Sequence, residues 1–231
     1  MSFGQNLQFL RKMHEGMTQE ALAERMGVSR QTVSKWEMDS AFPEMEKAVA
    51  LSELFSCSLD ELLRGNMNSD NEAYTGIRVE NVPPFRYVRH IVISSTPEDD
   101  AIRHMTDWAA ANGIKAPEII GLDFPTVTPE QISVHHMHGY LAACVLPPNF
   151  QATCADIVII AQAKQRYAVI TIREPFAAPF TLIPNAYKTL MRYMDVNGLK
   201  HRETKEVLPC FEKVYKRDVA TYMDVYIAVD N

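Results

Sequence analysis

The sequence predicts two domains: an all-α domain of five helices, followed by an α+β domain in which two βαββ repeats share a curved antiparallel sheet. Three observations support this prediction. Apolar residues recur at helical spacing as far as Gly65, alternating strand patterns begin near Ile77, and short segments of the later region occur twice in the same order. The predicted boundaries are 1–65 for the first domain, 66–76 for a polar linker and 77–231 for the second domain.

Five helices are predicted in the first domain from apolar spacing and capping residues. Phe3, Leu7 and Leu10 form the inner stripe of the first helix, and the last helix is short. The start and stop signals are, in chain order, Gly16, Thr18, Gly27, Pro43, the capping box of Ser58 with Glu61, and Gly65.

A helix-turn-helix pattern spans Gln19 to Met38. Ala23 is small enough to let two helices approach, and Gly27 supplies the left-handed backbone that a turn between helices commonly needs. Val33 and Trp36 face inward. The helical period then leaves four polar side chains on the outer face, each able to bind a base edge or a phosphate in the major groove: Arg30, Gln31, Ser34 and Lys35.

The stretch from Phe3 to Arg64 resembles the phage-repressor-type XRE family, in which Thr18 and Gln19 open the second helix and Ser29 opens the third. The resemblance implies that double-stranded operator DNA is contacted by Gln19, Arg30, Gln31 and Lys35. Arg30 stands where phage members commonly have amides. Because one helix-turn-helix covers too few base pairs for useful specificity, we expect a homodimer on an inverted repeat.

The composition is that of an ordinary soluble globular protein, with 47% apolar and 23% charged residues. No apolar stretch is long enough to span a membrane and the N-terminus lacks a signal pattern, so we expect a cytoplasmic protein with no membrane partner. Four scattered cysteines indicate reduced thiols. The net charge of -6 argues against a general nucleic-acid coat, but five basic residues against three acidic ones between Arg11 and Lys35 favour a local basic edge.

Three pairs of similar segments mark the two repeats of the second domain. Residues 85–88 are repeated at 165–168, residues 108–115 at 193–200, and residues 140–142 at 226–228, at offsets of 80, 85 and 86 residues. Each copy predicts a strand, a helix and two strands. Two such units side by side give a curved antiparallel sheet with helices on one face and a cleft on the other.

The end of this domain resembles the gyrase-inhibitor-like effector-binding domain, the small-molecule module of many bacterial regulators. The resemblance rests on Pro209–Tyr215 and on the terminal strand Asp224–Val229. Ala228 stands where the family usually has proline, and His135–His138 stands where many members have a charged pair. The resemblance implies a ligand-binding cleft.

Glu212 is the central candidate for ligand binding. Its neighbours Phe211, Val214 and Tyr215 are apolar, so its carboxylate needs compensation. The resemblance implies that Glu212 contacts the ligand, and a carboxylate among aromatic rings suits a cationic or polarised aromatic compound. Period-two alternation places Tyr226 in the cleft if the opposite face of its strand packs on the helices. The alternative is a structural glutamate paired within the fold.

Three more aromatic residues are candidates for the cleft. Tyr140 is the repeat equivalent of Tyr226, and Trp108 and Tyr193 are repeat equivalents on the two helices, where core packing is the alternative. Within the cluster His135, His136 and His138, the last two share one face of a strand, but the local sequence supplies no third ligand on that face, so we expect no metal site. The sequence contains no nucleophile-elbow, phosphate-loop or metal-ligand motif, and we expect no cofactor.

These observations favour a one-component bacterial transcription regulator with a small-molecule sensor over an enzyme. Two alternatives remain open. The C-terminal domain could hydrolyse a reactive small molecule, in which case it would consume the compound that Glu212 binds. It could instead serve only as a ligand-free dimerisation module, which predicts a cleft filled by its own side chains.

Overall fold

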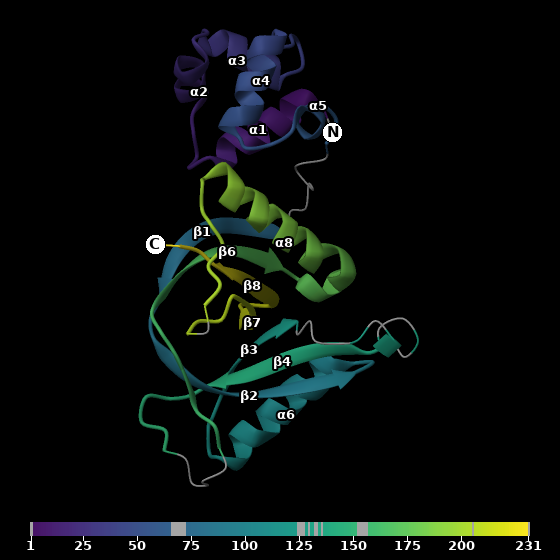
Figure 1. The fold of residues 1–231 in the computed structure, drawn as a ribbon, viewed down its shortest axis with the longest axis vertical. Coiled ribbons are helices and arrows are strands. Elements are labelled where there is room, and N and C mark those ends of the chain that lie inside the picture. Colours follow the sequence, from purple (N-terminus) through teal and green to yellow (C-terminus); the bar gives the residue numbers. More distant parts are fainter. Residues whose placement is uncertain are drawn as a thin grey trace. The chain divides into compact units, whose positions relative to one another are not determined.

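The computed structural model describes residues 2–230 except 66–72, 124–127, 129, 132, 133, 135, 152–156 and 205 (Figure 1). It divides into two compact units. The first unit comprises Met1–Tyr74 with Ala178–Lys200, and the second comprises Thr75–Ala177 with His201–Asn231. Most of the predicted linker lies outside the described residues, and a strand already begins at Tyr74 within it. The predicted domain boundaries themselves remain a prediction.

All five predicted N-terminal helices are present. They are α1 (Phe3–Met13), α2 (Gln19–Met26), α3 (Arg30–Glu37), α4 (Met45–Leu54) and α5 (Leu59–Arg64). The side chains of Thr18, Ser29 and Ser58 accept hydrogen bonds from the backbone amides three residues on, and Ser58 with Glu61 completes the predicted capping box. The local sequence signals therefore set where these helices begin.

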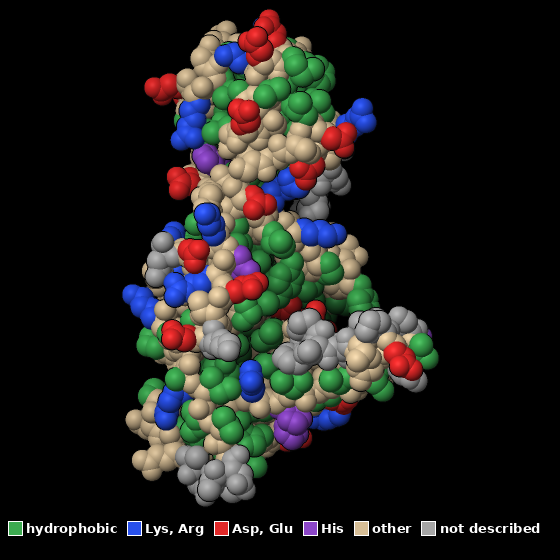
Figure 2. Space-filling model, viewed as in Figure 1, with side chains coloured by type: hydrophobic (Ala, Val, Ile, Leu, Met, Phe, Trp, Pro, Cys, Tyr) green, Lys and Arg blue, Asp and Glu red, His purple; other side chains and the backbone are tan. Residues whose placement is uncertain are grey.

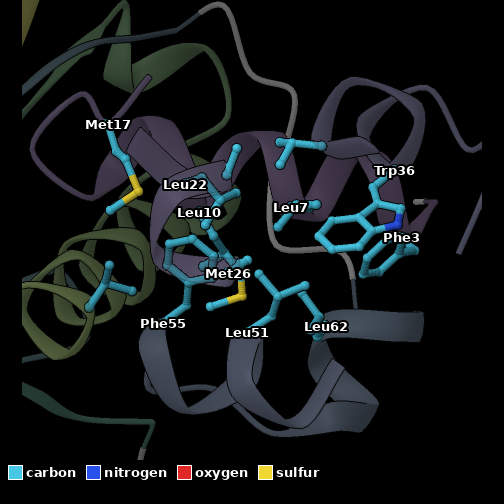
Figure 3. Close-up of a cluster of buried hydrophobic side chains, with 13 residues drawn as sticks. Phe3, Leu7, Leu10, Met17, Leu22, Met26, Trp36, Leu51, Phe55 and Leu62 are labelled. Atoms are coloured by element: carbon cyan, nitrogen blue, oxygen red, sulfur yellow. The ribbon is translucent and has the colours of Figure 1, made fainter. Parts of the chain in front are cut away.

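One apolar cluster holds the five helices together (Figure 3). Leu7, Leu10, Leu51 and Leu62 are fully buried in it, and the larger rings of Phe3 and Trp36 are nearly so. The backbones of α1 and α3 approach so closely that a Cβ on Gly4 would lie 2.5 Å from the carbonyl oxygens of Trp36 and Glu37. A side chain at position 4 is therefore incompatible with this packing.

The second unit is built on an eight-stranded sheet in the order β1-β6-β8-β7-β3-β4-β2-β5. The strands are β1 (Tyr74–Val82), β2 (Phe85–Ser94), β3 (Glu118–Asp123), β4 (His138–Val145), β5 (Ile160–Gln162), β6 (Gln165–Arg173), β7 (Cys210–Arg217) and β8 (Ala220–Ala228). Helix α6 (Pro97–Ala111) packs on β2, β4 and β3, and a 3-10 turn η1 (Pro175–Ala177) follows β6. Figure 1 shows the sheet curling strongly.

The predicted βαββ repeats are confirmed. The first is β2-α6-β3-β4 and the second is β6-α8-β7-β8, with α8 spanning Pro179–Val196. The repeats meet where β3 pairs antiparallel with β7. Two edge strands, β1 and β5, were not predicted as parts of the sheet.

Two of the three repeated segments occupy equivalent places, and the third is shifted by three residues. Tyr87 and Tyr167 are both buried in one cluster, as the offset of 80 predicts. The offset of 86 in the last pair is wrong. Tyr87 pairs with Val145 and Tyr167 pairs with Ala228, so the strand register has an offset of 83 and aligns Tyr226 with Ala143. A shift by an odd number of residues along a strand reverses the face on which a side chain lies. Tyr140 and Tyr226 therefore face opposite sides of the sheet.

Helix α8 differs from α6 in the unit to which it belongs. It is grouped with the five N-terminal helices, and Arg192 Nη2 lies 2.7 Å from Glu61 Oε1 on α5. The Arg192 hydrogen bond, followed by bonds from Ser58, lowers the pKa of Glu61 to about 2. The ionised carboxylate of Glu61 thus links α8 to the capping box of α5.

The Glu61 contact predicts a pH dependence of stability. Since the pKa is lowered on folding, the stabilisation is present above the unfolded pKa near 4.5 and is lost as the pH falls to about 2. The carboxylate is substantially exposed, so we expect Glu61→Gln to lower the free energy of unfolding by about 0.2–1 kcal/mol at pH 6. Denaturant titrations from pH 6 to pH 2 should show this difference vanishing, with Asp60→Asn as the charge control. A difference that persists at pH 2 would contradict the assignment.

Candidate functional site

The recognition helix α3 presents the polar face that its sequence predicts. Gly27 ends α2 in the left-handed conformation with a φ of 63°, which turns the chain into α3. Val33 and Trp36 are buried, which fixes the rotation of α3 about its axis. Of the predicted DNA contacts on this helix, Arg30, Gln31 and Lys35 are exposed and Ser34 is half-buried.

Arg30 forms an ion pair with Glu20 at the surface. Its Nε lies 2.7 Å from Oε1 of Glu20 on α2, and both side chains are about two-thirds exposed, at 64% and 65%. An ion pair with this exposure contributes at most about 1 kcal/mol. Arg30 can therefore exchange Glu20 for a base or a phosphate at little cost.

Gln19 lies in a network inside the domain. Its Nε2 donates to Oε2 of Glu37 over 2.8 Å, and Glu37 in turn pairs with the buried guanidinium of Arg11 at 2.5 Å. The Arg11 Nη1 group also donates to the Met17 carbonyl. The amide of Gln19 is thus oriented by Glu37, which the sequence analysis did not anticipate.

Charges of both signs are interspersed on the face of the five helices seen in Figure 2. The local excess of basic residues between Arg11 and Lys35 therefore does not make this face uniformly basic.

Glu212 lies where the two repeats meet, beside Tyr140. Glu212 on β7 pairs with Gly121 on β3, and the ring of Tyr140 lies directly over Gly121. A Cβ at position 121 would fall 2.0 Å from the Tyr140 hydroxyl oxygen, so glycine is required there. The Tyr140 hydroxyl is hydrogen-bonded to Glu212. Burial, followed by the charge of Glu212, raises the pKa of Tyr140 well above its usual value.

Two further carboxylates act on the same phenol. The charges of Glu98 at the start of α6 and Asp123 at the end of β3 also raise the pKa of Tyr140. Desolvation by burial, as the main cause, raises the pKa of each of these carboxyls above its ordinary value, and His138 opposes the shift. Within the described parts of the chain, neither Glu98 nor Asp123 forms a salt bridge. The structure thus brings three carboxylates and one phenol together, a grouping of which the sequence predicted only Glu212 and Tyr140.

Tyr226 lies on the other face of the sheet, so Glu212 and Tyr226 do not face one cleft. Tyr226 stacks on its cross-strand neighbour Phe211 with ring centroids 4.3 Å apart, and Tyr167 packs edge-on against both. All three rings are at least nine-tenths buried. The expectation that Glu212 and Tyr226 face the same cleft is therefore wrong, whereas Tyr226 as a ligand contact stays a prediction.

A charged network extends from Tyr226 that the sequence analysis missed. The buried carboxylate of Asp224 accepts a hydrogen bond from Arg78 Nη2 over 2.9 Å and from the Thr171 hydroxyl over 2.5 Å. Arg78 also pairs with Glu80 at 2.7 Å. Asp224 stands among apolar residues of the last strand, which indicates that its carboxylate needs a buried partner. The partner, Arg78, could not be identified because its strand β1 was not predicted as part of the sheet.

Trp108 and Tyr193 stay predictions as ligand contacts. Trp108 is half-buried on α6, 5.9 Å from the ring of Phe150, which fits the core-packing alternative. Tyr193 is half-buried on α8 and belongs to the first unit. His135 lies outside the described residues, and His136 and His138 are exposed. In the described ranges, no group of three His, Cys, Asp or Glu side chains could hold a metal ion.

Comparison with known proteins identifies the N-terminal part. Residues 7–62 match the family model described as helix-turn-helix. The transcriptional activator BcrR of Enterococcus faecalis is 46% identical over 65 residues, which are 28% of this chain and 31% of that protein. The chain thus spans about a third of the length of this curated relative. The structure of the P22 c2 repressor with a synthetic operator is 35% identical and covers 29% of this chain and 98% of that one, with a TM-score of 0.27.

Another solved structure covers a larger share of this chain at low identity. The protein SAV2435 bound to tetraphenylphosphonium is 14% identical, with a TM-score of 0.42 over 68% of this chain and 95% of that chain. Among the helices that the structure describes, none combines the length and apolar character needed to cross a membrane.

Proposed function

We propose that this chain is a one-component transcription regulator of the cytoplasm, because its residues 7–62 match the helix-turn-helix family model. It binds operator DNA as a homodimer through α3, and a small molecule bound near Glu212 changes its affinity for the operator. The observation that carries the DNA-binding half is the exposed polar face of α3, fixed in rotation by buried Val33 and Trp36.

The proposed ligand is a small cation with aromatic or delocalised character. Glu98, Asp123 and Glu212 supply negative charge around the buried Tyr140. Glu98 and Asp123 are exposed and Glu212 is half-buried, so a cation from solvent can reach these carboxylates and is attracted by their charge. The Tyr140 ring offers an aromatic face to the same ligand. This grouping of carboxylates is the observation that supports the sensor.

The sensor is tested with a duplex selected from a random-sequence pool by the parent protein. Tetraphenylphosphonium, a delocalised aromatic cation, serves as the ligand probe, and neutral triphenylphosphine oxide serves as its control. The cation is expected to change the affinity for this duplex by about 5- to 150-fold, the usual range of coupling between two sites. The same affinity with and without the cation would count against the sensor.

A second candidate is a ligand-free dimerisation module, which the aromatic packing around Tyr226 favours. Calorimetric titration separates the two, because such a module binds no aromatic cation while its dimer persists in sedimentation. Turnover distinguishes a hydrolase from a sensor. Mass spectrometry would show that a hydrolase consumes the compound that it binds, whereas a sensor releases it unchanged.

Arg30→Ala is expected to weaken binding to the selected duplex by about 1–3 kcal/mol and to relax specificity at one base position. The reason is the loss of a bidentate contact from an exposed guanidinium on α3. Arg64→Ala is the matched control, since Arg64 is also exposed and ion-paired, to Asp60 on α5. Binding should be measured at one fixed salt concentration. An equal loss on all sequences would reassign Arg30 to a phosphate.

The homodimer predicts a protected inverted repeat on the same duplex. The half-site centres should lie about one helical turn, or a multiple of it, apart, because two α3 helices must enter successive major grooves on one side of the DNA. Hydroxyl-radical footprinting checks this spacing. A single protected half-site with one copy bound would contradict the homodimer.

A further inference from the structure

Helix α8 belongs to one domain by its place in the sequence and to the other by its contacts. In the sequence it is the helix of the second βαββ repeat, between β6 and β7. In the structure it groups with the five helices of the DNA-binding domain, and its last residue, Val196, is buried in their apolar core with Leu10 and Phe55. A side chain more than 130 positions beyond α5 therefore completes that core.

Directional contacts surround Val196. The carbonyl oxygen of Val196 lies 3.0 Å from His14 Nδ1 at the end of α1, and Asn197 Nδ2 donates to the Met13 carbonyl over 3.2 Å. On the other side of His14, Nε2 lies 3.1 Å from Arg25 Nη1, at the end of α2. One turn back along α8, Arg192 pairs with Glu61 of α5. The end of α8 thus contacts α1 and α5 directly and reaches α2 through one imidazole.

The repeat supplies an internal comparison for these contacts. Helix α6 ends in the same way as α8: Asn112 Nδ2 donates to the Trp108 carbonyl over 2.9 Å, as Asn197 Nδ2 does to the Tyr193 carbonyl over 2.8 Å. A glycine with positive φ follows each asparagine. Asn197 alone of the two also bonds to the DNA-binding domain. The asparagine bond and the following glycine, which both helices share, therefore end the helix. The additional bond from Asn197 to Met13 attaches α8 to the DNA-binding domain.

We propose that α8 is the sixth helix of the DNA-binding domain and that its docking on α1 and α5 sets that domain's affinity for DNA. Since residues 174–178 and 197–209 join α8 to strands of the sheet, a change in the sheet on ligand binding is passed to the DNA-binding helices through α8. This regulatory consequence rests on the proposed function, whereas the docking itself does not.

Docking is tested by amide hydrogen exchange on the full chain, without ligand. The double variant Arg192→Ala/Asn197→Ala removes the α5 and α1 contacts, and Arg103→Ala/Asn112→Ala removes the corresponding ion pair and cap from α6. The reporters are the amides of His14 and Leu62, which bond to Leu10 and Ser58. Loss of two contacts should speed their exchange about tenfold in the first variant and leave it unchanged in the second. Equal exchange in both variants would overturn the proposal.

The effect on DNA is tested with Val196→Asp and the selected duplex. A carboxylate in this apolar core expels α8, so affinity should fall at least tenfold, while Val196→Ile should bind as the parent does. Loss of the helical signal of the whole domain would equally support α8 as an integral part of it. Parental affinity in Val196→Asp would overturn control by docking. Failure of the sensor would appear separately, as unchanged DNA affinity of the parent protein on addition of tetraphenylphosphonium.

Discussion

Arg11→Met is expected to lower the free energy of unfolding of the DNA-binding domain by about 3–5 kcal/mol, because it leaves the buried carboxylate of Glu37 without its cation. Both partners are nearly inaccessible to solvent, with side-chain exposures of 10% and 2%. The same substitution leaves the Met17 carbonyl, to which Arg11 also donates, without that partner. Urea unfolding followed by circular dichroism gives the measurement.

A double-mutant cycle separates the interaction from the cost of the unpaired charge. Arg11→Met/Glu37→Leu replaces the pair by apolar side chains of similar size and should recover most of the lost stability. Gln19, freed from Glu37, then loses its fixed orientation, so DNA affinity should stay reduced although stability returns. A double variant as unstable as Arg11→Met would show that the carboxylate of Glu37 is not the source of the loss.

The helix-turn-helix could be predicted nearly to the residue because its signals are local. The left-handed Gly27, the caps Thr18 and Ser29 and the buried pair Val33 and Trp36 each act within one or two helical turns. The Arg11–Glu37 pair could not be predicted, since it joins residues 26 positions apart whose approach depends on how α1 packs on α3.

The surroundings of the proposed ligand site were predicted less well because they depend on strand register. An offset of 86, where the strand register has 83, placed Tyr140 and Tyr226 on one face, whereas the two side chains lie on opposite faces. Glu98 and Asp123 were missed because neither lies near Glu212 in the sequence. The grouping of α8 with the N-terminal helices was equally unpredictable, since its sequence repeats that of a helix that packs on the sheet.

Glu212→Gln is expected to lower the affinity for tetraphenylphosphonium by about 1.5–3 kcal/mol, or about one to two decades in dissociation constant. Glutamine keeps the shape and an oxygen that accepts the Tyr140 hydrogen bond, but it removes the charge. Binding should also weaken as the pH falls, since the raised pKa values of Glu98 and Asp123 cause these carboxylates to lose their charge at a higher pH than usual. Isothermal titration calorimetry measures both effects.

The same substitution distinguishes a ligand-binding glutamate from a structural one. With two other carboxylates acting on Tyr140, removing one charge relieves repulsion, so the melting temperature of Glu212→Gln should be unchanged or slightly higher. Glu118→Gln is the matched control, because Glu118 lies on the neighbouring strand β3 and forms an exposed pair with Lys213 at 2.8 Å. That variant should bind the cation as the parent does. If Glu212 served only the fold, its substitution would lower the melting temperature strongly and leave the cation affinity of the parent intact.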